Sequence, residues 1–300
     1  MELIAYREHL DSVKAKPTVT SYIRSAKLFI EFLSSEDWKI ETMPVYAVQQ
    51  YMDSISKRFA GRSLRTYYYG IRHYLAWLKG RGIEFSEQTK ADMPRAKDPK
   101  RILFSMSQIV SILKYSRGID DPPRTALILM LASGVRVSEL CSLKLSDLQV
   151  KTVGNHKHLM LRIVHGKRGK SRMVPVMKFA APFVKNYAKH MKRTAEGWLF
   201  PSPKNKGSSI STSAILRWTK IAARKLKFKM HPHAFRRTYA TMLLESGIGE
   251  IALQRILGHE NLDTTSMYAN PSDAFLADAV ERAEGTLWER ISAESPTKKK

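Results

Sequence analysis

Residues 231–270 read HPHAFRRTYATMLLESGIGEIALQRILGHENLDTTSMYAN, and the rest of the chain is interpreted from this stretch. A histidine and an arginine, His233 and Arg236, stand three residues apart. A Gly-His pair that ends in His259 comes later, and Tyr268 follows in a polar setting. These side chains suit phosphoryl transfer through a protein nucleophile without a metal. The tyrosine would attack, the arginine would hold non-bridging oxygens, and the histidines would move protons or donate hydrogen bonds.

The order of these residues resembles the active site of the tyrosine recombinase (phage integrase) family, in which H-x-x-R is followed by L-G-H and then by the nucleophilic tyrosine. The resemblance requires an arginine box upstream and a lysine on a β-hairpin, and the chain contains both. G-V-R-V-S-E-L resembles the family's G-x-R-x-S-E-L and supplies Arg136, with Glu139 as a carboxylate that orients it or a neighbouring histidine. G-K-R-G-K-S-R, residues 166–172, resembles the family's G-K-G-x-K-x-R. It supplies Lys167 by position, with Lys170 as the alternative because the loop is rich in basic residues.

The resemblance implies a mechanism in which Tyr268 attacks a DNA phosphodiester and forms a 3′-phosphotyrosine with a free 5′-hydroxyl. Arg136 and Arg236 would stabilise charge on the phosphorus. His233 would take the tyrosine proton, His259 would hydrogen-bond a non-bridging oxygen, and the hairpin lysine would protonate the leaving oxygen. The arginines would do the work of a metal and the protein linkage would store the bond energy, so no cofactor is expected.

Other interpretations of these motifs are less favoured. Arg136 and Glu139 alone could form a surface ion pair worth less than about 1 kcal/mol. The basic hairpin could contact phosphates without its lysine taking part in the reaction. For the whole chain, the alternatives are a type IB topoisomerase-like or hairpin-forming DNA strand transferase, and a catalytically silent DNA-binding relative. A basic protein of the membrane surface is disfavoured because the chain lacks an amphipathic segment of aromatic and basic residues.

The charge of the chain points to a nucleic acid partner. The formal net charge is +24, and residues 162–237 hold 20 lysines and arginines against one acid. Residues 238–297 hold 3 basic residues against 10 acids, so we expect that segment to pack on protein rather than DNA. The basic side chains expected to bind DNA are Arg62, Arg65, Arg72, Arg168, Lys170, Arg172, Arg217, Lys220, Arg224 and Arg237.

The cysteine count and the hydropathy pattern indicate an intracellular protein without a membrane anchor. With DNA as the expected partner, we expect it in the cytoplasm, associated with the nucleoid. Cys141 is the one cysteine, so no intrachain disulfide forms, which fits a reducing compartment. No apolar run approaches the length of a membrane span, and the charged N-terminus does not resemble a signal peptide. No CxxC or HExxH spacing indicates a metal site.

The periodicity of apolar residues predicts a mainly α protein with a small antiparallel β-sheet. Residues 1–90 read as a helical bundle that resembles the family's core-binding, DNA-binding domain, with Pro17 expected to interrupt the first helical pattern. Residues 91–103 read as a linker, 104–291 as an α+β catalytic domain that ends in a helix, and 292–300 as a basic tail.

Within the catalytic domain, the apolar run Thr125–Ser133 predicts a buried helix. Gly258 is expected to end the helix of residues 250–257, because glycine adopts the left-handed conformation at a helix end.

The central part of the catalytic domain changes its period. Leu159, Leu161 and Ile163 alternate with other residues, which predicts a strand, and residues 148–153 and 173–176 are expected to pair with it.

The resemblance also implies partners. They are double-stranded DNA with a specific recombination site and a homotetramer on that DNA, joined by exchange of C-terminal helices. No added arm-binding domain is expected, which favours a plan similar to the Xer recombinases. The sequence leaves open the target site, the need for an accessory protein, and the choice between chromosome dimer resolution and integration of a mobile element.

Overall fold

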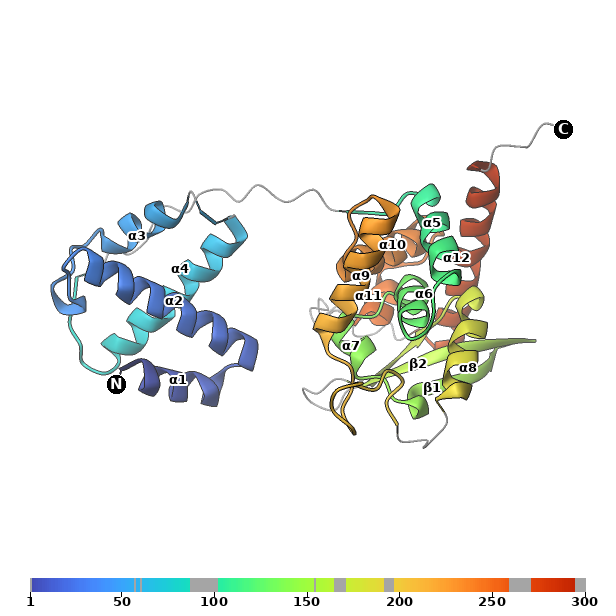
Figure 1. Cartoon of the computed structure of the whole chain (residues 1–300), viewed down its shortest axis with the longest axis horizontal. Coiled ribbons are helices and arrows are strands. Elements are labelled where there is room, and N and C mark those ends of the chain that lie inside the picture. The colour runs from blue at the N-terminus through green and yellow to red at the C-terminus, as the bar shows by residue number, and fades with distance from the viewer. Residues whose placement is uncertain are drawn as a thin grey trace. The chain divides into compact units, whose positions relative to one another are not determined.

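The computed structural model describes residues 2–56, 58–59, 61–86, 102–153, 155–164, 171–191, 197–258 and 271–294 (Figure 1). The chain divides into two compact units, Met1–Lys100 and Arg101–Lys300. Helices dominate both units, and one three-stranded antiparallel sheet lies in the second, so the predicted fold class is confirmed. Most of the predicted linker, 91–103, lies outside the described residues.

Helices build the N-terminal unit around one apolar core. α2 and α4 pack closely because Gly70 has no side chain; a Cβ there would lie 2.6 Å from the Cβ of Ser25. Tyr6, Phe29 and Ile71 are fully buried between the helices. The bounds are α1 Glu2–Val13, α2 Lys16–Ser35, the 3-10 turn η1 Ile40–Thr42, α3 Ala47–Ser56 and α4 Gly61–Lys79.

The first helical pattern is interrupted next to Pro17, as predicted, because α1 ends at Val13. Pro17 itself lies in the first turn of α2, which begins at Lys16. The first turn of a helix lacks intrahelical acceptors for its N–H groups, so proline loses no hydrogen bond there.

The C-terminal unit is organised around α6, where every residue from Thr125 to Ser133 is buried, as predicted. Other helices surround it. α5 begins in a capping box, in which the Ser105 hydroxyl accepts from the Gln108 N–H and the Gln108 side chain accepts from the Ser105 N–H. The bounds are α5 Met106–Arg117, α6 Pro123–Ser133, α7 Val137–Cys141, η2 Leu145–Asp147, η3 Lys178–Ala180, α8 Ala181–His190, α9 Thr212–Leu226, α10 Pro232–Glu245, α11 Glu250–Leu257 and α12 Asp273–Glu294.

The sheet has the predicted order and direction. β1 Leu148–Val153, β2 His156–Val164 and β3 Ser171–Pro175 pair antiparallel in the order β1-β2-β3. Leu161 lies opposite Leu148 on one side and Val174 on the other. Met160, the residue before Leu161 on β2, is also fully buried. Residues 165–170, between β2 and β3, lie outside the described residues.

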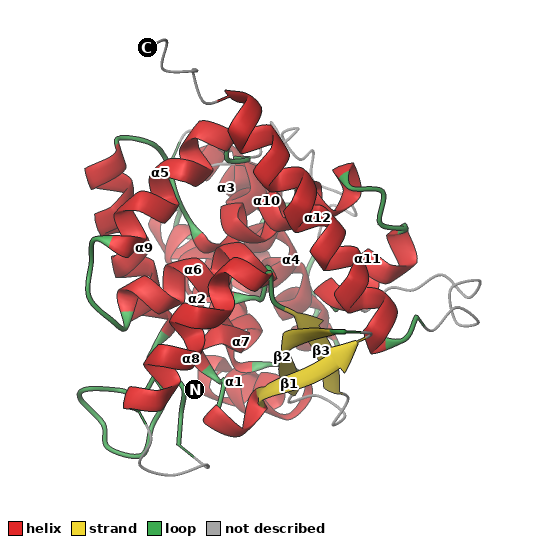
Figure 2. Ribbon diagram, turned by 90° about the vertical axis from the view of Figure 1, so that its right-hand side faces the viewer, coloured by secondary structure: helices red, strands yellow, loops and turns green. Residues whose placement is uncertain are grey.

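α12 covers its own domain. Figure 2 shows it close to the sheet and to α11, and it contacts β1, β3, α5 and α10. Its own residues Leu276, Val280 and Leu287 are buried. The prediction that the acidic segment packs on protein is therefore confirmed for α12.

Carboxylates attach α12 to basic groups near the sheet. Asp273 accepts from Lys151 Nζ at 2.6 Å, and Glu284 accepts from the Phe179 N–H at 2.9 Å. Glu281 pairs with Lys178 Nζ and lies 3.4 Å from Nε2 of the buried His158. Burial lowers the pKa of His158 against the opposing charge of Glu281.

Across the described part of the chain, no helix is long and apolar enough to cross a membrane.

Candidate active site

The first arginine box is held in place by the turn between α6 and α7. Gly134 ends α6 in the left-handed conformation, with φ +59°. A Cβ at Gly134 would lie 2.4 Å from Cδ1 of Tyr239 in α10, so the turn passes α10 at a distance that only glycine allows. Two residues later Arg136 stands at the N-cap of α7, and its backbone N–H donates to Glu139 Oε2 at 2.8 Å.

Glu139 is the centre of a buried ion-pair network. Arg136 Nη1 donates to Oε1 at 3.0 Å. Arg172 of β3 donates from Nη1 to Oε1 and from Nη2 to Oε2, both at 2.9 Å. The side chains of Glu139 and Arg172 are 7% and 8% exposed, whereas that of Arg136 is 35% exposed. Burial acts to raise the pKa of the Glu139 carboxyl, but the hydrogen bonds and charges of Arg172 and Arg136 outweigh it and hold the pKa below its usual value.

Three arginines meet the C-terminal end of α11. Arg172 Nε donates to the Ile256 carbonyl at 2.9 Å, and Arg136 Nη2 donates to the Gly258 carbonyl at 2.9 Å. Between them the Leu257 carbonyl accepts from Arg236 Nη2 at 2.6 Å. The last carbonyls of a helix have no intrahelical partner and carry the negative end of the helix dipole, so guanidinium groups stabilise this end.

Gly258 ends α11 as predicted, in the left-handed conformation with φ +66°. The next residue is His259, and Tyr268 follows in the same segment. The arginine cluster therefore holds the end of α11, one residue before His259.

The second arginine box begins with a histidine that the sequence analysis did not single out. His231 is the N-cap of α10, and its Nδ1 accepts from the Ala234 N–H at 3.1 Å. His233, two residues later, is exposed, and its ring centroid lies 6.4 Å from that of His231. On the same helix Arg236 points inward and donates from Nη1 to the Gly134 carbonyl at 2.9 Å.

The electrostatics of the cluster suit an anion. Among the described residues, three guanidinium groups and the carboxylate of Glu139 meet here, which leaves an excess of two positive charges beside the helix end. Burial, with the positive charges of Arg136 and Arg172 beside it, lowers the pKa of Arg236 to about 10, so this guanidinium is still charged at neutral pH. A partly exposed cluster of this sign and geometry matches the planar, multidentate recognition of a phosphate.

Arg172 has a different role from the one expected. The sequence analysis placed it among the DNA contacts, but its guanidinium is buried and donates to Glu139 and Ile256. A sequence signal was available. Arg172 lies two residues from the buried Val174 on one strand, so both side chains point to the same face of the sheet.

The other expected site residues divide into two groups. Lys167, Arg168, Lys170, His259 and Tyr268 lie outside the described residues, and so does the side chain of Arg62. Their roles remain predictions. The described basic residues of α9, α10 and α4 take different exposures. Arg217, Lys220, Arg224 and Arg65 are exposed, whereas Arg72 and Arg237 are half-buried.

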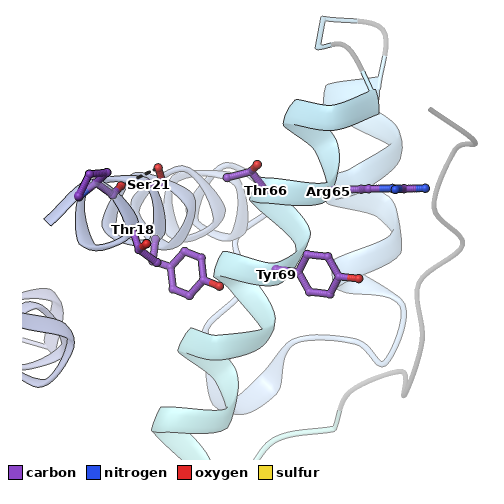
Figure 3. A pocket seen from close by; sticks show the side chains of 7 residues that line it. Thr18, Ser21, Arg65, Thr66 and Tyr69 are labelled. Carbon is purple, nitrogen blue, oxygen red and sulfur yellow. Dashed lines mark hydrogen bonds between the residues drawn. The ribbon is translucent and has the colours of Figure 1, made fainter. Parts of the chain in front are cut away.

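A hollow of about 450 Å³ on the N-terminal unit lies next to Arg65. Figure 3 shows that Thr18 and Ser21 line it from α2, and that Arg65, Thr66 and Tyr69 line it from α4. Tyr69 is 60% exposed. The hollow thus gathers hydroxyl groups, an aromatic ring and a guanidinium on one exposed face of this unit.

Fold and site together define a two-unit protein whose second unit gathers guanidinium groups for an anion. Comparison with known proteins names the family. The model of the phage integrase family matches residues 103–274. The chain therefore belongs to the phage integrase family, and it is a tyrosine-type site-specific recombinase.

Individual relatives agree with this assignment. A tyrosine recombinase of Pseudothermotoga lettingae is 28% identical over 270 residues, which cover 88% of this chain and 91% of the relative. Tyrosine recombinase XerA of Pyrococcus furiosus is 30% identical, with 75% of this chain and 77% of the relative covered. The solved structure of the XerH site-specific recombinase bound to its difH substrate, a pre-cleavage complex, superposes with a TM-score of 0.65 at 16% identity. That match covers 87% of this chain and 78% of XerH, and it supports the fold.

Proposed function

We propose that this recombinase cuts and rejoins DNA at a specific site through a 3′-phosphotyrosine on Tyr268. The observation that carries the proposal is the convergence of Arg136, Arg172 and Arg236 on the last carbonyls of α11. These arginines come from three separate parts of the sequence, and they meet one residue before His259.

The proposed cleavage step balances in atoms and charge. The Tyr268 hydroxyl attacks the scissile phosphorus and loses its proton to His233. The bond from phosphorus to the 5′ oxygen breaks, and Lys167 gives that oxygen a proton. Rejoining runs in reverse, with the 5′-hydroxyl of another strand attacking the phosphotyrosine. No bond energy is lost to water, because each phosphodiester is exchanged for a phosphotyrosine and then for a new phosphodiester.

Arg136 and Arg236 are proposed to bind the non-bridging oxygens, together with His259. Charge accumulates on those oxygens as the phosphorus becomes pentacoordinate, so fixed donors aimed at them lower the barrier. Removing one such donor from an enzyme typically costs on the order of 10²–10³ in rate. The excess positive charge of the cluster supports this role.

The DNA partner is proposed to lie on the exposed basic side of α9 and on the face of the N-terminal unit that carries Arg65 and Tyr69. Such contacts to phosphates would make binding strongly dependent on salt. XerH is bound to its difH substrate in the solved complex, and by analogy we propose a specific double-stranded site for this chain, inside the cell. Two duplexes would be joined by four protomers, exchanging strands through a Holliday junction and C-terminal helices between neighbours.

The experiment uses a nicked suicide DNA substrate made from a pool of source-genome fragments and resolves the products on a denaturing gel. We expect a covalent protein–DNA adduct with the natural chain and none with Tyr268→Phe, while both bind DNA equally. Tyr46→Phe is the matched control, because Tyr46 is exposed on the other unit, outside the proposed DNA contacts, and its replacement should leave the adduct unchanged. Adduct formation by Tyr268→Phe would refute the assignment.

The same experiment separates the remaining roles. Sequencing the captured DNA distinguishes a single chromosomal site, as dimer resolution requires, from the ends of a mobile element. Joining of strands between two labelled duplexes distinguishes recombination from topoisomerase-like strand transfer within one duplex.

A further inference from the structure

We propose that Arg172 is a positioning residue of the reaction: through Glu139 and the Ile256 carbonyl it fixes the phosphate-binding guanidinium of Arg136 against the end of α11. This inference rests on the proposed function. It replaces the expectation that Arg172 contacts DNA, and it assigns this buried arginine of β3 a role in positioning Arg136.

The first argument is the way in which Arg172 is used. Its guanidinium makes a two-point contact with Glu139, at 2.9 Å to each oxygen, and Nε reaches the Ile256 carbonyl at 2.9 Å. Two parallel bonds to a carboxylate fix the plane of both groups. At 8% exposure the side chain is almost out of reach of solvent and of any DNA lying on the surface.

The second argument concerns what Arg172 does for Arg136. Glu139 is 7% exposed, and a buried carboxylate needs compensating charge and hydrogen bonds. Arg172 supplies the buried, bidentate share of that compensation. Arg136 therefore donates only Nη1 to Glu139 and Nη2 to the Gly258 carbonyl, and its side chain stays 35% exposed. Without Arg172, Arg136 would be drawn toward Glu139 and away from a phosphate.

The third argument is the fit between Arg172 and Gly258. A Cβ on Gly258 would lie 2.8 Å from Cζ of Arg172, 2.8 Å from Nη1 and 2.9 Å from Nε. The glycine of the L-G-H motif thus leaves room for this guanidinium as well as adopting the left-handed conformation. Arg172 joins the first arginine box, the hairpin strand and the helix that precedes His259 in one network.

The test compares Arg172→Lys with Arg136→Lys and with the double variant. Lysine keeps the charge but loses the two-point contact, so Arg172→Lys should slow adduct formation by about 10- to 100-fold, the loss typical of removing the outer partner of a catalytic group. Affinity for the same nicked DNA should stay within about threefold, because many phosphate contacts supply it. In the Arg136→Lys background, Arg172→Lys should slow the reaction by less than about threefold, since it acts through Arg136.

Arg162→Lys is the matched control. Arg162 of β2 also pairs with a carboxylate that is 7% exposed, that of Asp147, with Nε 3.0 Å from Oδ1. Among the described residues, no hydrogen bond or ion pair joins Arg162 to Glu139 or Arg172. The control should form the adduct at the natural rate.

Several results would overturn the inference. One is an unchanged rate with Arg172→Lys. Another is an equal reduction in the rate of adduct formation when Arg172→Lys is added to the Arg136→Lys background, which would mean that the two residues act independently. Weakened DNA binding would show a general structural role instead. If Arg172→Lys does not fold, Glu139→Gln weakens the same bond with an isosteric side chain, and a natural rate in that variant contradicts the inference. Absence of adduct with the natural chain is a failure of the proposed function, and it is distinguishable from all of these.

Discussion

Replacing Gly258 by alanine should destabilise the catalytic unit by about 2.5–5 kcal/mol. The left-handed conformation, at φ +66°, costs a residue with a Cβ about 1–2 kcal/mol. The new Cβ would also lie 2.8 Å from Cζ of Arg172, a group held by three hydrogen bonds. Moving it breaks at least one bond to a charged group, at about 1.5–3 kcal/mol.

The matched control is Gly247→Ala. Gly247 also follows a helix and has φ +82°, but a Cβ there would have no atom within 4 Å. The control should therefore lose only the backbone share, about 1–2 kcal/mol. Scanning calorimetry of the full chain can follow the transition of the catalytic unit, and the gap between the variants corresponds to roughly 3–12 °C at about 2–4 °C per kcal/mol. Equal losses in the two variants would refute the close packing of Arg172 on Gly258.

Three further predictions concern stability. The pKa of Glu139 in the folded state lies below the usual 4.5, so its contribution to the free energy of unfolding is complete above pH 4.5 and is lost as the pH falls through the folded value. Stability should therefore fall less steeply with acid in Glu139→Gln, and an unchanged acid-unfolding profile would contradict this. Burial lowers the pKa of His158 below 6.5, with His156 and Lys178 acting in the same direction and Glu281 and Asp278 opposing. Docking of α12, followed by hydrogen exchange, should therefore weaken as the pH falls below 6.5, and His158→Phe should remove that dependence. Ser105→Ala should cost about 0.5–2 kcal/mol in urea unfolding through loss of the α5 capping box, and no loss would mean that the box is not formed.

Local signals in the sequence predicted much of the fold. The alternation of Leu159, Leu161 and Ile163 indicated β2, and the apolar run of α6 indicated a buried helix. Gly258 was expected to end α11 because glycine adopts the left-handed conformation without strain, and it does so. Each of these features depends on residues close to one another in the chain.

Features that depend on distant contacts were harder to predict. Arg172 bonds a carbonyl 84 residues away, and Arg136 bonds one 122 residues away, so neither partner could be inferred from spacing. The composition of the hairpin suggested a DNA contact for Arg172, whereas its position on a strand face decided its burial. The burial of Met160 could not be predicted, because alternation describes one face of a sheet and does not reveal what covers the other.

The candidate site was predictable as a set of residue types and not as a geometry. The family motifs indicated which side chains belong together. Those that the structure describes, Arg136, Glu139 and Arg236, do meet. The role of the α11 carbonyls was invisible, because backbone groups leave no mark in a sequence. The cap formed by His231 was not predicted, because the motif pointed to His233 instead. In the structure His231 caps α10 and His233 is exposed.

The most direct test of the central claim is to identify the amino acid that is bound to DNA. The covalent adduct would be trapped on a nicked substrate, digested with protease and nuclease, and sequenced by mass spectrometry. The proposed mechanism predicts a 3′-nucleotide on the peptide that contains Tyr268. A nucleotide on any other residue, such as Tyr69 or a serine, would contradict it.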